Sequence, residues 1–150
     1  VGLVLAAACD LRIASTETSF SIPEVDLGIP LAWGGIPRLV REIGPALTKE
    51  LVMTCRPFDA EEASEIGFVN KVTTIDGIDS AVNDLVSIIA AKSRIATLST
   101  KAHVNAVTSQ MVGTVRSWAD ADGLEVAMAD PESQEAQAEY LAQIKKKKSD

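Results

Sequence analysis

The sequence predicts an α/β fold followed by an all-helical region, because its two halves have different hydrophobic patterns. Residues 11–15 (LRIAS) and 18–22 (TSFSI) alternate apolar and polar side chains, as half-buried strands do. From residue 76 onward, apolar side chains instead recur at helical spacing, first at Ile78, Val82, Leu85, Val86 and Ile89. We therefore expect an α/β core over residues 1–75 and a helical region over residues 76–150.

The first half is predicted to begin with a helix and then these two strands. Residues 2–9 are small and apolar, which predicts a helix buried on all sides. A loop over residues 23–33 separates the strands from the next helix. Gly34 and Gly35 lead into that helix, which has Pro37 in its first turn and is expected to end at Gly44.

Further helix signals follow closely. Pro45 opens the helix PALTKELVMT, and Asp59 with Glu62 resembles the capping box of another helix, which ends at Gly67. Residues 68–72 (FVNKV) are expected to form a strand. The remaining segments 76–92 and 95–147 are expected to be helical, with breaks near Gly113, Gly123 and Pro131.

Composition and charge exclude several classes of protein. Hydrophobic residues make up 47% and charged residues 23% of the chain, as in a globular protein and unlike a disordered one. The formal charge is −7, from 21 acidic and 14 basic residues, which disfavours nucleic acid as a partner. No apolar run approaches the roughly 18–20 residues of a membrane helix. The N-terminal VGLVLAAACD lacks the basic flank and the length of a signal peptide.

The cysteines and the histidine indicate no metal or disulfide chemistry. Cys9 and Cys55 are too few for a disulfide framework, which predicts a reducing, cytoplasmic setting. Neither lies near a His/Cys cluster, so no metal is expected, and His103 is expected to be a structural or surface residue.

Because the chain begins inside an apolar, helix-like run without an initiator methionine, we expect a segment to precede Val1 in the complete protein.

Four motifs between Gly2 and Val72 occur in the order known from one family. They are GLVLAAACDLRIAS, FSIPEVDLGIP, GGIPRLVREIG and ELVMTCRPFDAEEASEIGFVNKV, and STKAHVNAV (99–107) adds a less specific match. The sequence thereby resembles the crotonase superfamily, the enoyl-CoA hydratase/isomerase family. The resemblance implies a ββα spiral core, with residues 1–75 as its C-terminal part, followed by helices that assemble a homotrimer or hexamer. The chain would then be the C-terminal half to two-thirds of a member.

The resemblance also implies a substrate and a catalytic group. Family members act on acyl-CoA thioesters, so coenzyme A is expected as part of the substrate and not as a permanently bound cofactor. The glutamate of the family's PE loop is an acid/base beside the thioester, and Glu24 matches it. Its neighbours are apolar, and loss of hydration disfavours a charged carboxylate, which suits a group that takes and returns a proton. Without the resemblance, Glu24 would be interpreted more simply as a surface glutamate at a turn.

Two positions near Glu24 bear on the type of reaction. Hydratases of the family use a second glutamate, but the matching residue is Val4, which neither holds a water nor moves a proton. Dienoyl-CoA isomerases carry an extra aspartate where Ala32 stands. The resemblance therefore implies a shift of one double bond in an enoyl-CoA by a single carboxylate. The alternatives are hydration by a variant active site, a non-catalytic member that binds acyl-CoA or a partner protein, and an incomplete, inactive fragment.

The resemblance places further residues around the substrate. The backbone N–H at Val1, next to Gly2, matches one donor of the family's oxyanion hole, and the other donor would precede residue 1. Val4, Leu31 and Trp33 are expected to line the substrate pocket, although Trp33 would equally serve to cap the loop onto the core. The run Lys145–Lys148 is expected to be either the solvated basic end of a helix or a contact for the phosphates of coenzyme A.

Overall fold

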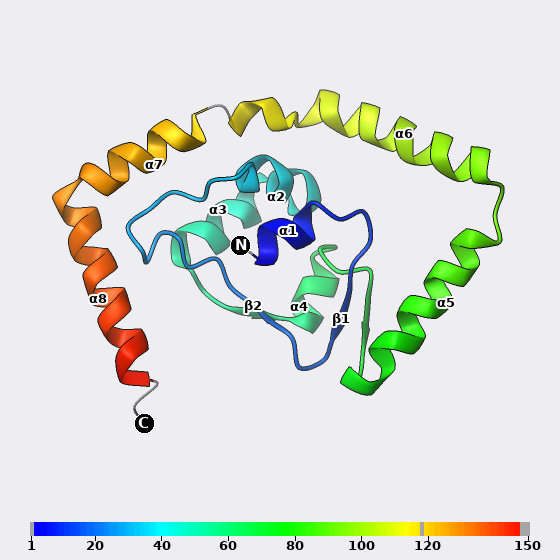
Figure 1. Ribbon diagram of the computed structural model, residues 1–150, viewed down its shortest axis with the longest axis horizontal. Coiled ribbons are helices and arrows are strands. Elements are labelled where there is room, and N and C mark those ends of the chain that lie inside the picture. Colours follow the sequence, from blue (N-terminus) through cyan, green and yellow to red (C-terminus); the bar gives the residue numbers. More distant parts are fainter. Residues whose placement is uncertain (1, 118, 148–150) are drawn as a thin grey trace.

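Short elements alternate in the first half of the chain, and long helices form the second half (Figure 1). The computed structural model describes residues 2–117 and 119–147. The first half contains α1 (Gly2–Ala7), β1 (Ile13–Ser15), β2 (Ser19–Phe20), α2 (Gly35–Ile43), α3 (Pro45–Thr54), β3 (Phe58–Asp59), α4 (Ala60–Glu65) and β4 (Lys71–Thr73). The second half contains the 3₁₀ turn η1 (Ile75–Gly77), α5 (Ile78–Ala90), α6 (Arg94–Met111), the 3₁₀ turn η2 (Thr114–Ser117), α7 (Asp120–Ala129) and α8 (Pro131–Lys147).

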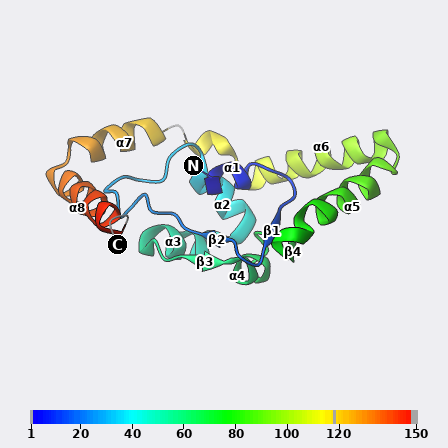
Figure 2. The same ribbon diagram turned by 60° about the horizontal axis from the view of Figure 1, so that its bottom comes forward.

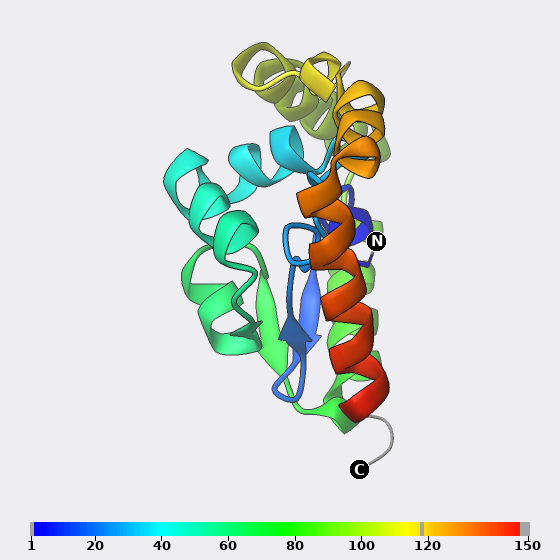
Figure 3. The ribbon, with the colours of Figure 1, turned by 90° about the vertical axis from the view of Figure 1, so that its left-hand side faces the viewer.

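The long helices form an arch around the core. In Figure 1, α5 lies on one side of the short elements, α6 and α7 pass above them, and α8 descends on the other side. Helices α3 and α4 lie together on one side of the short strands (Figure 2, Figure 3). Within the described ranges, none of the helices is both long and apolar enough to cross a membrane.

Two small sheets hold the core together. β1 pairs with β4 in parallel, with Ile13 opposite Lys71, and β2 pairs with β3 in antiparallel register, with Phe20 opposite Phe58. The rings of Phe20 and Phe58 stack with their centroids 5.2 Å apart, and Phe68 meets Phe20 edge to face at 5.8 Å. The first pair lies within the β2–β3 sheet, and the second packs this sheet against the segment that leads into β4. Such aromatic pairs bury large apolar areas in preferred geometries.

The predicted helix boundaries of the first half are largely confirmed. Gly44, at φ 78°, ends α2, and Pro45 is the first residue of α3. The Asp59 carboxylate accepts a hydrogen bond of 2.8 Å from the Glu62 N–H at the start of α4. Gly67 follows the end of α4 at φ 78°, a left-handed conformation that glycine adopts without steric cost.

Three predictions about the elements were wrong. Helix α1 is not buried on all sides, because only Val4 and Ala7 are buried and the Leu5 side chain is 67% exposed. The strand predicted over residues 68–72 is β4, which begins only at Lys71. Gly123 breaks no helix, since α7 continues from Asp120 to Ala129. The expected breaks near Gly113 and Pro131 are confirmed.

The late start of β4 has a physical cause. The N–H of Val69 donates to the Ala63 carbonyl at 2.9 Å, and the N–H of Asn70 donates to the Arg12 carbonyl at 2.9 Å. These bonds hold the segment against α4 and the residue before β1, so strand pairing starts after it. Phe68 and Val69 are consequently core residues of a connecting segment and not strand residues.

The buried apolar core belongs almost entirely to the first half of the chain. It consists of Val4, Ala7, Ala14, Ile22, Leu31, Leu39, Leu51, Val52, Phe58, Ala60, Ala63, Phe68 and Val69. Among the described residues of α5 to α8, Ala81 alone is buried. Many large apolar side chains of α5 and α6 are exposed, among them Val82, Val86, Ile88, Ile95, Leu98, Val104, Val107 and Met111.

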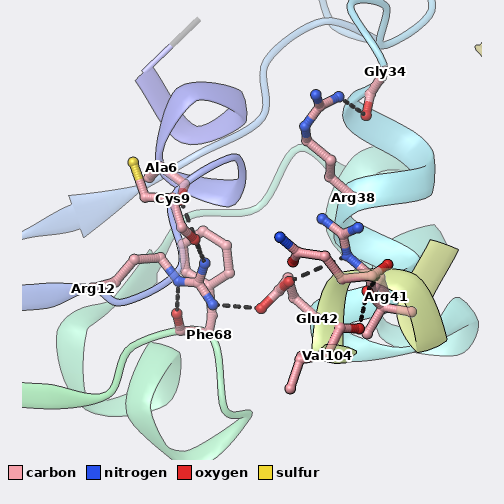
Figure 4. Close-up of polar contacts among 11 residues, drawn as sticks. Ala6, Cys9, Arg12, Gly34, Arg38, Arg41, Glu42, Phe68 and Val104 are labelled. Carbon is pink, nitrogen blue, oxygen red and sulfur yellow. Dashed lines mark hydrogen bonds and ion pairs between the residues drawn. The ribbon is translucent and has the colours of Figure 1, made fainter. Parts of the chain in front are cut away.

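A buried arginine connects the separate pieces of this core (Figure 4). The Arg12 side chain donates to the carbonyl oxygens of Cys9, at 2.7 Å, and Phe68, and its guanidinium lies 4.8 Å from the centroid of the Phe68 ring. It also donates to the Glu42 carboxylate of α2 at 2.5 Å. Because Arg12 is only 9% exposed, these bonds replace the water that its charge would otherwise need.

We expect Arg12→Met to lower the free energy of unfolding of the complete protein by about 3–5 kcal/mol, because Glu42 and two carbonyls lose their donor. Urea denaturation measures this loss. The matched control is Arg56→Met, which removes ion pairs of Arg56 with Glu50 and Glu62 at the surface and should cost much less. Equal losses for the two variants would contradict the role given to Arg12.

Candidate active site

A largely apolar cavity lies between α1, β2 and the loop that runs from Ser21 to Trp33. Its volume is about 570 Å³. The described residues predicted for the site, namely Gly2, Val4, Glu24, Leu31 and Trp33, all line it. The structure therefore brings them together in one place, while their roles stay predictions. Val1 lies outside the described residues.

Glu24 is the only ionisable side chain among the described residues that line this cavity. Its carboxylate oxygen Oε2 is buried and has no hydrogen-bond partner in the part of the chain that is described. The Glu24 carbonyl accepts hydrogen bonds from the N–H groups of Leu27, at 3.1 Å, and Ile29, at 3.0 Å, which fixes the turn. A buried acceptor without a partner costs about 1–3 kcal/mol, so one that lies at a cavity is a candidate functional group.

The part of the cavity wall where a second carboxylate would have to stand, at Val4, is apolar. Val4 is 9% exposed and packs with Leu31 beside Gly35 at the start of α2. A Cβ atom on Gly35 would lie 2.8 Å from Leu31 Cγ and 3.1 Å from Val4 Cγ2, so α2 approaches these two side chains as closely as a glycine permits. This packing leaves Val4 as a hydrophobic wall residue.

The backbone of α1 lies at the same cavity. Gly2 is the first residue of α1 and lines the cavity. N–H groups in the first turn of a helix have no acceptor inside the helix, so they are available to an anion. This geometry is compatible with the predicted oxyanion donor near Gly2, and the role itself stays a prediction.

Trp33 stands at the rim of the cavity. Its backbone has φ 60°, in the left-handed region that large side chains rarely adopt, and its side chain is 65% exposed. The exposure fits a residue at the cavity rim better than one that caps the loop onto the core. Gly34, at φ 66°, follows in the same conformation and donates its N–H to the Asp120 carboxylate of α7 at 2.8 Å.

Cys55 lies behind the loop that carries Glu24. Its thiol faces the backbone of Val25 and Asp26, and burial raises its pKa. A thiol with a raised pKa stays protonated near neutral pH, so it packs as a small apolar group and is a poor nucleophile. Within residues 2–117 and 119–147, no cluster of three His, Cys, Asp or Glu side chains is placed to hold a metal ion.

The sequence motifs missed two residues of this region, Asp120 and Leu124. Leu124 lines the cavity from α7, a hundred positions away from Glu24, and Asp120 binds the loop end at Gly34. Neither residue belongs to one of the four motifs, and helical periodicity alone does not tell which helix returns to the core. Of the predicted run Lys145–Lys148, Lys145 and Lys146 lie near the end of α8 and do not line the cavity, and Lys148 is outside the described residues.

Comparison with known proteins identifies the family. The family model described as enoyl-CoA hydratase/isomerase matches residues 1–148, and the chain belongs to this family. A short-chain-enoyl-CoA hydratase of Clostridioides difficile is 45% identical over 95 residues, which are 63% of this chain and 61% of that protein. A crotonyl-CoA hydratase of Syntrophomonas wolfei is 33% identical over 144 residues, which are 96% of this chain and 55% of that protein.

The solved structures agree on the fold. A crystal structure of an enoyl-CoA hydratase/isomerase from Pseudoalteromonas atlantica superimposes with a TM-score of 0.83 over 95% of this chain and 57% of that one. The two sequences are 21% identical, so this likeness concerns the fold alone. The predicted family and the predicted crotonase-like α/β fold with an all-helical region are thereby confirmed. The chain spans roughly half to three-fifths of the length of these relatives.

Proposed function

We propose that the complete protein shifts a double bond in an enoyl-CoA, with Glu24 as its single acid/base. One observation carries this proposal: Glu24 is the only ionisable side chain among the described residues that line the cavity, and one of its oxygens is buried without a partner. The family membership supports a coenzyme A thioester as substrate. No permanently bound cofactor is part of the proposal.

A single carboxylate is sufficient for this reaction. The ionised Glu24 takes a proton from the carbon between the thioester carbonyl and the double bond, and the electron pair moves onto the carbonyl oxygen as an enolate. The resulting acid returns the proton two carbons further along, which moves the double bond next to the carbonyl. The enolate oxygen requires hydrogen-bond donors, and we assign one of them to the start of α1 near Val1 and Gly2.

Hydration is the second candidate, and the names of the two similar relatives, both hydratases, favour it. Adding water requires a group that positions and activates the water opposite Glu24, and Val4 offers only methyl groups there. For this reason we place isomerisation first. A member that binds acyl-CoA without turning it over is a third candidate, which the buried carboxylate in the cavity disfavours.

The proposed assembly is a homotrimer or a hexamer. Many large apolar side chains are exposed along α5 and α6, and a second copy would cover them. A cytoplasmic location stays a prediction from the cysteine content.

We expect Glu24→Gln to lower kcat for a 3-enoyl-CoA by about 10²–10⁴-fold, because glutamine is similar in shape but moves no proton. Binding of the coenzyme A ester should change by only a few fold, which calorimetry measures alongside the rate. The control is Glu65→Gln, an exposed residue of α4 away from the cavity. Retained activity in Glu24→Gln would overturn the proposed role.

We expect Val4→Glu to raise hydration of a 2-enoyl-CoA above that of the wild type, since it introduces the missing second carboxylate. Val4→Gln is the matched control, because it adds the same bulk and polarity without a group that ionises. A wild-type hydration rate near the enzyme median of about 10 per second would contradict our interpretation of Val4.

We expect light scattering of the complete protein at micromolar concentration to give the mass of three copies or a multiple of three. The exposed apolar faces of α5 and α6 provide the driving force for association. A single species with the mass of one copy would contradict the proposed assembly.

A further inference from the structure

The loop that carries Glu24 is held from outside by α7 and α8 (Figure 3). At the loop end, the Gly34 N–H donates to the Asp120 carboxylate at 2.8 Å. In the middle of the loop, a Cβ atom on Gly123 of α7 would lie 3.7 Å from Pro30 Cγ. Near Glu24, Gly28 approaches α8 so closely that a Cβ atom there would lie 2.7 Å from the Cα atom of Ser133.

One face of α7 makes the contacts with this loop. Asp120, Gly123 and Leu124 are spaced i, i+3 and i+4, so they lie side by side on the helix. Asp120 anchors the helix, Gly123 permits its close approach to the loop, and Leu124 lines the cavity that Glu24 also lines. Asp120 also lies in the first turn of α7, where a negative charge is favourable.

We propose that Leu124 is a specificity-determining residue that limits the length of the acyl chain, and that Asp120 is the positioning residue that holds Leu124 there. This inference rests on the proposed function, because it assumes that the cavity accepts the acyl part of a coenzyme A thioester. Leu124 is apolar and lines the cavity from α7, outside the loop, so its size affects the space that the cavity offers to an acyl chain. The Asp120–Gly34 hydrogen bond holds α7 against the loop, and this keeps Leu124 in the lining of the cavity.

The test measures the affinities of butyryl-CoA and octanoyl-CoA for the complete protein by calorimetry, with the ratio of the two dissociation constants as the readout. Leu124→Ala should shift this ratio toward octanoyl-CoA by about tenfold, because one extra or missing methylene group in an apolar pocket is worth roughly 10–200-fold. Leu124→Phe should shift it toward butyryl-CoA. Leu141→Ala, an exposed leucine of α8 outside the cavity, is the matched control and should leave the ratio unchanged.

Asp120 is tested with the same readout. Asp120→Ala removes the acceptor for Gly34 and should shift the ratio in the same direction as Leu124→Ala, with little further shift in the double variant. Asp120→Asn keeps an oxygen that accepts the Gly34 N–H and should restore the wild-type ratio. A role in stability alone would lower the unfolding temperature of Asp120→Ala and leave the ratio unchanged.

The outcomes separate this inference from the proposed function. If the wild type binds both esters and neither Leu124 variant changes the ratio, the inference is wrong and the proposed function stands. If the wild type binds neither ester, both are wrong. Circular dichroism of each variant checks its folding. Because Leu124→Ala and Leu124→Phe are expected to shift the ratio in opposite directions, either variant alone tests the inference when the other fails to fold.

Discussion

The buried guanidinium of Arg12 is the contact on which the rest of the core depends. Removing a charge from water is costly, and the cost is offset when the charge is paired and hydrogen-bonded. Arg12 meets this requirement with carbonyl oxygens at the end of α1 and before β4, and with the Glu42 carboxylate of α2. Three segments that are distant in sequence are therefore fixed relative to one another by one side chain.

The candidate site depends on the same arrangement. The cavity is bounded by α1, whose end Arg12 binds, and by the loop that leads into α2, whose Glu42 Arg12 also binds. Glu24 lies on this loop, with its backbone fixed by a turn and one side-chain oxygen without a partner among the described residues. A carboxylate held at a cavity with an oxygen free to meet a substrate is compatible with general acid/base chemistry.

Local signals predicted the parts of this structure that local physics decides. Gly44, Pro45 and Asp59 mark helix ends because their backbone or side chain acts within a few residues. The motif around Glu24 is contiguous as well, so the sequence alone makes this residue a candidate. The burial of α1, the start of β4 and the continuity of α7 through Gly123 depend instead on partners far away in sequence. Asp120 and Leu124 were missed for the same reason, since only the folded chain brings α7 to the loop.

The central claim is that one carboxylate both takes and returns the proton, and the mass of the product formed in D₂O tests it most directly. Because Glu24 Oε2 is buried, the transferred proton should return to the substrate before it exchanges with solvent. We therefore expect a 3-enoyl-CoA to give a 2-enoyl-CoA of the same mass, with deuterium in a minority of the molecules. A product that has gained a molecule of D₂O would contradict the account, because water would then have added across the double bond.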